Sequence, residues 1–289
     1  MLSQARRRLF TTSTSPLVAI EHHIGRDHPT ATLTLNGPPV NSLSLEMLSA
    51  LRNAIVEVDA SPSRGFVLAS SHPTIFSAGL DIQELHNPDE TRLRDFWTTL
   101  QDTFLALYGS SCASVAAIDG HAPAGGCLLA SACDERVMAS GKFGIGLNET
   151  KLGITAPFWF ADALEPLIGQ RRLERMLQLG SLLTPAEALE AGLVDALADH
   201  GGKRGADGDE GGQASPVLTR AHEILEGYVA VNHEARHASK LLVRSAALER
   251  LRTRKQEDLD AFLAYCLSPG YQATIGAYLE GLKGRKKGG

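Results

Sequence analysis

The stretch Val115–Cys133, VAAIDGHAPAGGCLLASAC, joins three kinds of local sequence that together decide the fold. Val115–Ile118 is a short apolar run of the kind that forms a buried strand. Asp119–Gly126 contains a proline and three glycines and is typical of a turn. Cys127–Cys133 is rich in small and apolar residues and predicts a buried helix. A strand that is followed by a turn and then by a helix is the repeating unit of a parallel sheet, so this stretch indicates an α/β fold.

The sequence before this stretch supplies further strands and one helix. Val18–His22 and Ala31–Leu35 predict two paired strands, the second with alternating threonines. Phe66–Ser70 predicts another short apolar strand. Between them, an amphipathic helix that ends before Pro62 is predicted by apolar residues spaced three and four apart. These residues are Leu48, Leu51, Ile55 and Val58.

The sequence after this stretch predicts mainly helices. Thr184-Pro185-Ala186-Glu187 is a capping box with proline at the first helical position, and Gly192 ends that helix. Leu193–Leu197 predicts a returning strand. Residues 199–216 hold six glycines in 18 positions and few apolar side chains, which predicts a flexible surface insertion. The C-terminal region 217–289 is expected to be helical over Ala221–Val229, Ala238–Leu251, Asp258–Leu267 and Tyr271–Leu282.

Composition limits the class of protein. The 289 residues are 43% hydrophobic and 21% charged, as in an ordinary soluble globular domain, which we place at residues 17–198. No apolar run approaches the roughly 20 residues of a membrane span, so we expect no stable membrane insertion. Four cysteines without CxxC spacing predict neither a zinc site nor a disulfide framework.

The N-terminal residues 1–16 differ from the rest of the chain. They carry Arg6, Arg7 and Arg8, several serines and threonines, and no acid, a profile typical of an organellar transit peptide. A disordered basic tail is the alternative. Without this segment the chain has 25 basic and 33 acidic side chains, so nucleic acid is not an expected partner.

Three segments carry the candidate chemistry. Phe76–Asp81 (FSAGLD) and Pro123–Cys127 (PAGGC) are glycine-bearing turns whose backbone N–H groups are available to a developing oxyanion. Glu149, between Asn148 and Thr150, supplies one carboxylate as a base. Such glycines are commonly packing devices, and such a glutamate is commonly solvated or a helix cap. The order and spacing of the three segments together favour a catalytic site.

The same segments resemble the crotonase (enoyl-CoA hydratase/isomerase) family over residues 17–285. The resemblance rests on FSAGLD, IDGHAPAGGC at 118–127, GLNETKLGI at 146–154 and LTPAEALEAGLVD at 183–195. PPVNSLSLE at 38–46 and GITAPFW at 153–159 are similar to the mitochondrial Δ3,Δ2-enoyl-CoA isomerases of that family. The resemblance implies a crotonase-like spiral of ββα units, a C-terminal helical trimerisation region, a homotrimer and a mitochondrial matrix location.

The resemblance also implies roles for residues. Glu149 would be the catalytic residue, and the N–H groups of Leu80 and Gly125 would form the oxyanion hole. The acyl-CoA substrate would contact Ala78, Gly79, Leu80, Asp81, Ile82, Gly125 and Asn148. The bend Asn41–Leu43 lies where the family places the nucleotide. CoA would be part of the substrate, so no separate cofactor and no metal are expected.

The predicted reaction moves a double bond. Hydratases of the family use a second acid in the helix after PAGGC, where this chain has Leu128. We therefore expect conversion of 3-enoyl-CoA to trans-2-enoyl-CoA in β-oxidation of unsaturated fatty acids, by single-base 1,3-proton transfer. Enoyl-CoA hydration or another acyl-CoA reaction is the alternative, and a binding protein that has lost catalysis is a further one. Phe158 and Trp159 line an acyl tunnel or pack in the core, and His121 shapes its loop.

Overall fold

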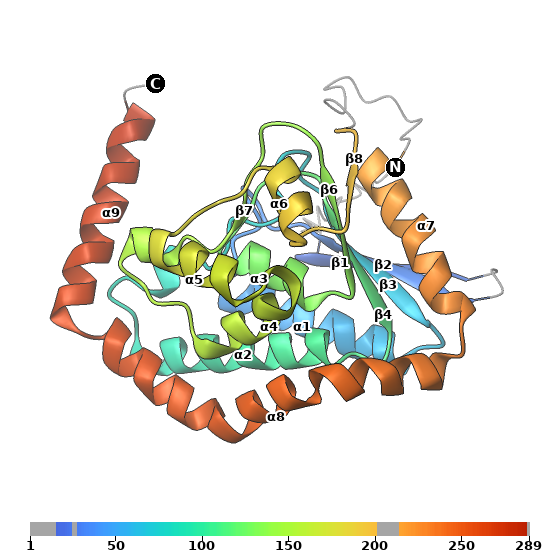
Figure 1. The fold of residues 1–289 in the computed structure, drawn as a ribbon. Helices are drawn as coiled ribbons and strands as arrows, with labels where there is room; N and C mark the ends of the chain where they lie inside the picture. The colour runs from blue at the N-terminus through green and yellow to red at the C-terminus, as the bar shows by residue number, and fades with distance from the viewer. Residues whose placement is uncertain (1–15, 25–27, 201–213, 288–289) are drawn as a thin grey trace, which may run out of the picture.

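The structure is a computed structural model that describes residues 16–24, 28–200 and 214–287, with side chains described as far as residue 281 (Figure 1). Its centre is a six-stranded sheet in the order β1-β2-β3-β4-β6-β8. The strands are β1 (Val18–His23), β2 (Thr30–Leu35), β3 (Gly65–Ser70), β4 (Ala113–Ile118), β6 (Glu135–Ala139) and β8 (Ala196–Ala198). Only β1 and β2 pair antiparallel within this sheet. A second, two-stranded parallel sheet joins β5 (Ala122–Pro123) to β7 (Ile145–Gly146).

Helices cover both faces of the large sheet. Side chains alternate along a strand, so Phe66 and Leu68 of β3 enter the main core while Val67 and Ala69 face the other way. That second face is covered by α7 (Pro216–Ala230), which buries one residue every turn. The main core lies between the sheet and α1 (Leu45–Ala60), α2 (Glu90–Tyr108), α3 (Gly125–Ala132) and α4 (Phe158–Ile168).

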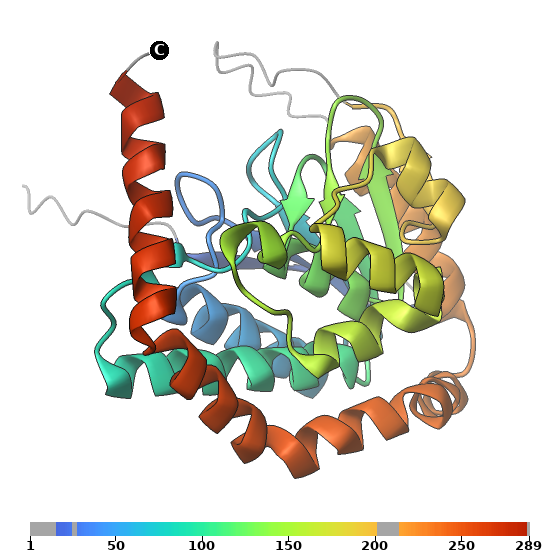
Figure 2. The ribbon, with the colours of Figure 1, turned by 60° about the vertical axis from the view of Figure 1, so that its left-hand side comes forward.

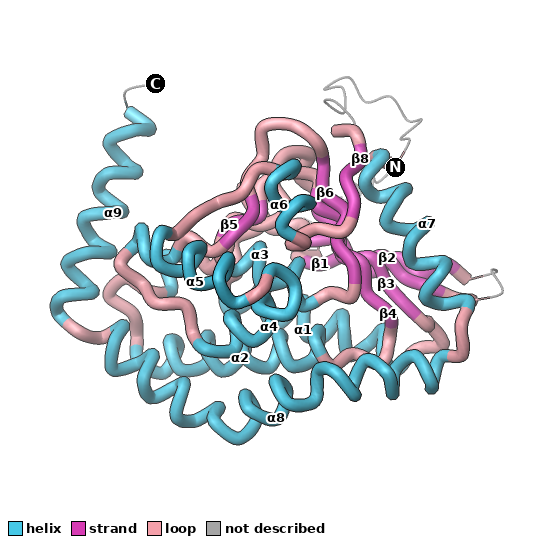
Figure 3. The backbone as a smooth tube through the Cα atoms, viewed as in Figure 1, coloured by secondary structure: helices cyan, strands magenta, loops and turns pink. Residues whose placement is uncertain are grey.

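Two long C-terminal helices complete the fold. Helix α8 (His233–Cys266) runs beneath α2 and α4, and α9 (Pro269–Lys287) stands at the edge of the molecule (Figures 1 and 2). Figure 3 shows how much of the chain outside the sheet is helical. The remaining helices are α5 (Gln170–Leu179), α6 (Pro185–Ala191) and the short 3₁₀ turns η1 (Ile82–Glu84) and η2 (Glu149–Leu152). No helix in the described ranges is both long and apolar enough to cross a bilayer.

The structure confirms the α/β class and most of the predicted elements. The N-terminal strands pair as expected, α1 ends at Ser61, and the capping box of Thr184 and Glu187 is formed. Gly192 adopts the left-handed conformation that ends α6. Helix α3 begins at Gly125, two residues earlier than predicted.

Two predictions were wrong. The strand expected at Leu193–Leu197 is only Ala196–Ala198, because the N–H groups of Leu193 and Val194 still bond to the carbonyl of Ala188 in the helix end. The helices expected at Ala238–Leu251 and Asp258–Leu267 are one continuous helix, α8, since the residues between them are strong helix formers.

Two other predictions fall largely outside the described residues. The transit peptide at residues 1–16 does so except for Pro16, and so does most of the insertion at 199–216. At the end of that insertion, Ser215 caps α7 and Pro216 is the first residue of the helix.

One carboxylate attaches α8 to the core. Asp258 Oδ2 accepts hydrogen bonds from Trp97 Nε1 (2.8 Å), Gln101 Nε2 (2.8 Å) and Trp159 Nε1 (3.1 Å). Trp97 also stacks on Phe262 of α8, with 3.6 Å between ring centroids. These three donors are buried and bond to α8, where Gln101 Nε2 also donates to Lys255 O (3.1 Å).

We expect Asp258→Ala to lower the free energy of unfolding by about 2–4 kcal/mol, because it leaves buried donors without an acceptor. Asp258→Asn, which keeps one acceptor oxygen, is expected to cost less. Urea unfolding followed by tryptophan fluorescence measures the difference. Asp260→Ala, two residues further along the same helix and exposed, is the control and is expected to change stability by less than about 0.5 kcal/mol. Equal effects of the Asp258 and Asp260 alanine variants would contradict this role.

Candidate active site

The small β5–β7 sheet brings the segments of the candidate site together. Ala122 and Pro123 pair with Ile145 and Gly146, and the N–H of Ala124 bonds to the carbonyl of Gly146 (2.8 Å). Helix α3 and turn η2 therefore start from adjacent points. The third segment, Phe76–Asp81, joins through the hydrogen bond from Phe76 N to His121 O (2.9 Å). Its other end bonds to Leu43, whose N–H donates to Gly79 O and whose carbonyl accepts from Asp81 N.

Two backbone N–H groups lie next to each other where these segments meet. A Cβ atom placed on Gly125 would lie 3.3 Å from Leu80 N, and one placed on Gly79 would lie 3.1 Å from Gly125 N. Neither Leu80 N nor Gly125 N donates to any acceptor among the described residues. Gly125 is the first residue of α3, so its N–H has no partner within the helix. Two neighbouring backbone N–H groups are the kind of donors that an oxyanion hole requires.

The backbone at Ala124 is strained. This residue precedes α3 with φ of +50° and ψ of −121°, a conformation that L-residues rarely adopt. Its N–H bonds to Gly146 O and its carbonyl accepts from Leu128 N (3.0 Å), so both of its peptide groups are held. The strained residue thus sets the direction of the following N–H, that of Gly125.

Glu149 is a buried acid with a free oxygen. It is the first residue of η2, only 8% of it is exposed, and its Oε2 has no hydrogen-bond partner. Burial raises the pKa of Glu149 to about 7 from its ordinary 4.5, against a smaller lowering by a backbone hydrogen bond. The carboxyl borders a cavity of about 200 Å³. An acid with this pKa exchanges protons readily near neutral pH.

The other predicted substrate contacts differ in their surroundings. Ala78 is exposed at the mouth of the turn, whereas the Asp81 side chain accepts from Gln83 N (3.0 Å) and caps η1. Ile82 is the first residue of η1 and is partly buried. Asn148 precedes Glu149, and its buried Oδ1 has no partner. The structure thus brings Asn148 and Glu149 together as two adjacent groups with unused acceptor oxygens.

Several other candidates pack in the core or shape loops. Leu128 is fully buried in α3, and Trp159 is fully buried against Trp97 and Phe104. Phe158 lies under the guanidinium groups of two α8 arginines rather than in the cavity beside Glu149. His121 Nδ1 accepts from Gly144 N (3.1 Å), as expected for a loop-shaping residue.

In the bend Asn41–Leu43, the side chain of Asn41 is not accessible to a nucleotide. The Asn41 side chain is fully buried and bonds to Gly37 N, Ser70 Oγ and Phe76 O. Its neighbour Leu43 instead approaches the oxyanion turn, since its Cδ1 lies 2.9 Å from the position of a Cβ on Gly125.

Most of the cavity wall comes from residues that no sequence motif predicted. Besides Glu149, the cavity is lined by Thr150, Thr155, Ala156, Leu177 and Gln178. Two of these come from α5, whose sequence has no motif that would connect it with Glu149. These two residues reach the cavity only because α5 packs directly on η2, a tertiary contact that the local sequence does not indicate.

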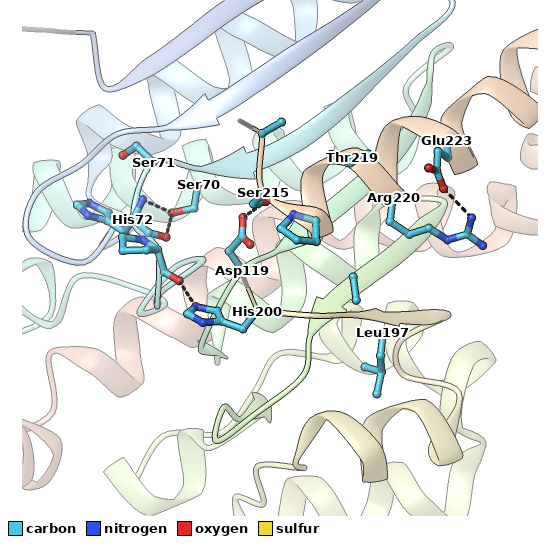
Figure 4. A pocket seen from close by; sticks show the side chains of 14 residues that line it. Ser70, Ser71, His72, Asp119, Leu197, His200, Ser215, Thr219, Arg220 and Glu223 are labelled. Carbon is cyan, nitrogen blue, oxygen red and sulfur yellow. Dashed lines mark hydrogen bonds and ion pairs between the residues drawn. The ribbon is translucent and has the colours of Figure 1, made fainter. Parts of the chain in front are cut away.

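A larger hollow of about 530 Å³ lies elsewhere, between the ends of β3, β4 and β8 and the start of α7 (Figure 4). Its polar groups include Asp119, whose Oδ2 accepts from Ser215 Oγ (2.9 Å), and His200, which contacts Pro73 O. Asp119 begins the turn that leads to Gly125, but neither Leu80, Gly125 nor Glu149 lines this hollow. In the described part of the chain, no three His, Cys, Asp or Glu side chains are grouped as a metal site.

Known proteins that resemble this chain identify its family. The model of the enoyl-CoA hydratase/isomerase family matches residues 26–200. The chain belongs to this family. It is 39% identical over 258 residues to the mouse protein named enoyl-CoA delta isomerase 1, mitochondrial, covering 89% of this chain and 84% of the mouse protein. The human protein of that name is also 39% identical, with 89% of this chain and 81% of the human protein covered.

Solved structures of the family share the fold. The crystal structure of human mitochondrial delta3-delta2-enoyl-CoA isomerase superimposes with a TM-score of 0.83 at 37% identity, over 93% of this chain and 99% of that chain. An enoyl-CoA hydratase from Bacillus halodurans superimposes with a TM-score of 0.76 at 23% identity, over 89% of this chain and 99% of that one, which shows the fold alone. The crotonase-like fold expected from the sequence, including its helical C-terminal region, is confirmed.

The raised pKa of Glu149 predicts a pH-dependent effect of Glu149→Gln on stability. Between pH 4.5 and 7 the carboxyl is ionised in the unfolded chain but protonated in the folded one, so it lowers native stability progressively as pH rises. Removing it is expected to raise the free energy of unfolding by about 3 kcal/mol at pH 8 and by less than about 1 kcal/mol at pH 5. Urea unfolding at both pH values measures this. Glu190→Gln, at an exposed position, is the control. A stability gain that does not change with pH would contradict the assignment.

Proposed function

We propose that this chain is a Δ3,Δ2-enoyl-CoA isomerase, converting 3-enoyl-CoA, cis or trans, to trans-2-enoyl-CoA. The observation that carries the proposal is one buried carboxyl, Glu149, joined through the β5–β7 sheet to the paired N–H groups of Leu80 and Gly125. The isomerase relatives, which match along most of this chain, support the same reaction.

The mechanism follows from the acidity of the substrate. The C2 protons of a 3-enoyl thioester lie between a carbonyl and an alkene. Glu149 takes one of them, and the resulting dienolate places its negative charge on the thioester oxygen. The N–H groups of Leu80 and Gly125 donate to that oxygen. The protonated Glu149 then returns the proton at C4, which moves the double bond into conjugation.

The environment of Glu149 favours proton transfer over addition of water. Hydration requires a second group to position and activate water, and the corresponding helix position is the apolar, fully buried Leu128. The cavity lining supplies only neutral side chains besides Glu149. Asn148, with its buried amide oxygen, is suited to orient the substrate or Glu149.

The assembly and location of the enzyme are part of the proposal. We infer a homotrimer that uses the C-terminal helical region, in which α9 stands at the edge of the protomer. The relatives are named mitochondrial, and residues 1–16 have the composition of a transit peptide, which supports a matrix location. CoA enters as part of the acyl-CoA substrate, and the proposed reaction uses no separate cofactor.

Conversion of a medium-chain 3-enoyl-CoA to its 2-enoyl isomer tests the function. For the wild type, the rate of isomerisation is expected to be much higher than the rate of water addition to 2-enoyl-CoA. Glu149→Gln is expected to lower kcat by about 10³-fold, as is usual for loss of a general base, whereas Glu190→Gln is expected to be unchanged. Isomerisation that survives in Glu149→Gln would exclude Glu149 as the base. If addition of water to 2-enoyl-CoA is faster than isomerisation of 3-enoyl-CoA, the chain is a hydratase and the isomerase proposal is wrong.

The same base predicts the pH profile of kcat/KM. Glu149 must be ionised in the free enzyme, so the rate should fall about tenfold per pH unit below a midpoint near pH 7. Initial rates between pH 5.5 and 8.5 at low substrate concentration measure this fall of kcat/KM on the acidic side of the profile. A profile that is flat across pH 7 would be inconsistent with a buried carboxyl base.

A further inference from the structure

Helix α3 connects the oxyanion hole to a cluster of cations. Its eight residues span about 12 Å. Gly125 lies at the N-terminal end, where Ala124 provides no side-chain cap. The carbonyl groups at the C-terminal end have no donors within the helix and need partners from elsewhere.

Arg244 of α8 supplies those partners. Its Nη1 donates to Ala132 O (3.0 Å) and its Nη2 donates to Cys133 O (3.1 Å), the last carbonyl groups of α3. Its Nη1 also donates to Tyr108 O (3.1 Å) at the end of α2, and its guanidinium lies 4.3 Å from the centroid of the Tyr108 ring. Only 14% of the side chain is exposed. One side chain thus joins the ends of two core helices.

The surroundings hold Arg244 in this geometry. Asp134 lies next to it (3.1 Å) and also pairs with Lys240 (3.0 Å) and Arg236 (3.9 Å), which precede it at four-residue steps on α8. Burial alone would raise the pKa of Asp134, but Lys240 and Arg244 hold it below its ordinary value. The cluster therefore has excess positive charge at the C-terminal end of α3, where it favours the helix dipole.

We propose that Arg244 is a positioning residue of the oxyanion hole, acting through α3 on the Gly125 N–H. The inference rests on the oxyanion role proposed above. Donors of an oxyanion hole work within about 2.7–3.1 Å of the oxygen. A short helix that is uncapped at its N-terminus has its axis fixed by packing and by the contacts at its other end. A tilt that shifts Gly125 N by about 1 Å is enough to lower the rate by about 100-fold.

Arg236 provides a matched comparison. It belongs to the same row on α8 and faces the same Asp134, but its hydrogen bond goes to Ser111 O and not to α3. Arg136 of β6 also donates to Cys133 O (3.1 Å), so that carbonyl stays bonded when Arg244 is changed. The contacts that depend on Arg244 are those to Ala132 O and to Tyr108 O. Arg244→Met and Arg236→Met therefore differ in the anchoring of the ends of α3 and α2, and of these two helices only α3 carries Gly125.

Two measurements below the melting temperature test the proposal. In Arg244→Met we expect kcat for 3-enoyl-CoA isomerisation to fall 10–100-fold, with KM within about threefold and the pH midpoint unchanged. In Arg236→Met we expect kcat within about threefold of wild type. The second readout is the red shift in absorbance of bound cinnamoyl-CoA, which reports polarisation of its thioester carbonyl. We expect a smaller shift in Arg244→Met only.

Arg244→Lys keeps the charge but cannot bridge the carbonyls as the guanidinium does, so it is expected to give an intermediate red shift and kcat. It replaces the methionine variant if that one does not fold. A folded Arg244→Lys with the wild-type red shift and kcat would overturn the proposal. Equal effects of the Arg244 and Arg236 methionine variants would do so as well. The red shift needs no turnover, so it still tests the positioning of α3 if wild type fails to isomerise 3-enoyl-CoA, which would refute the proposed function alone.

Discussion

The close approach of two backbone turns is the constraint on which the candidate site depends. The turn at Ser77–Leu80 lies against the start of α3 so tightly that a Cβ on Gly126 would be 2.6 Å from Ser77 O. Gly79, at φ of +87°, is in the left-handed region, where a side chain would also meet Ala124. Because glycine occupies these positions, Leu80 N and Gly125 N become neighbours. A larger residue at Gly79 or Gly126 would approach the backbone of the facing turn too closely for the two donors to stay where they are.

Two features of the candidate site are energetically unfavourable, and the surrounding fold stabilises them. Ala124 is strained, and Glu149 is buried without a full set of partners. The hydrogen bond from Ala124 N to Gly146 O fixes the strained residue to the β5–β7 sheet, and the same sheet leads into η2. One small element therefore holds both the donor and the base. Strain and an unsatisfied acid that persist in an otherwise well-packed core are typical of a site built for chemistry.

The sequence predicted the elements whose signals are local. The capping box at Thr184, the glycine turn before α3 and the lone acid Glu149 are patterns of a few residues, and each appears where it was expected. The cavity wall from α5 could not be predicted, because Leu177 and Gln178 reach Glu149 only through tertiary packing. The continuity of α8 was missed for a related reason. No apolar residue lies between the buried Leu251 and Leu259, so the amphipathic pattern is interrupted there although the backbone stays helical.

The C-terminal helices belong to the scaffold of the site as well as to the edge of the molecule. Helix α8 bonds to Ala132 at the end of α3 near its start and, through Asp258, to Trp159 of α4 near its end. These two helices follow the two segments that carry Gly125 and Glu149. A single long helix that holds both therefore limits how far the proposed oxyanion donor and the proposed base can move apart. These two contacts join residues that lie 112 and 99 positions apart in the sequence, which explains why the motifs alone predict the chemistry but not the geometry.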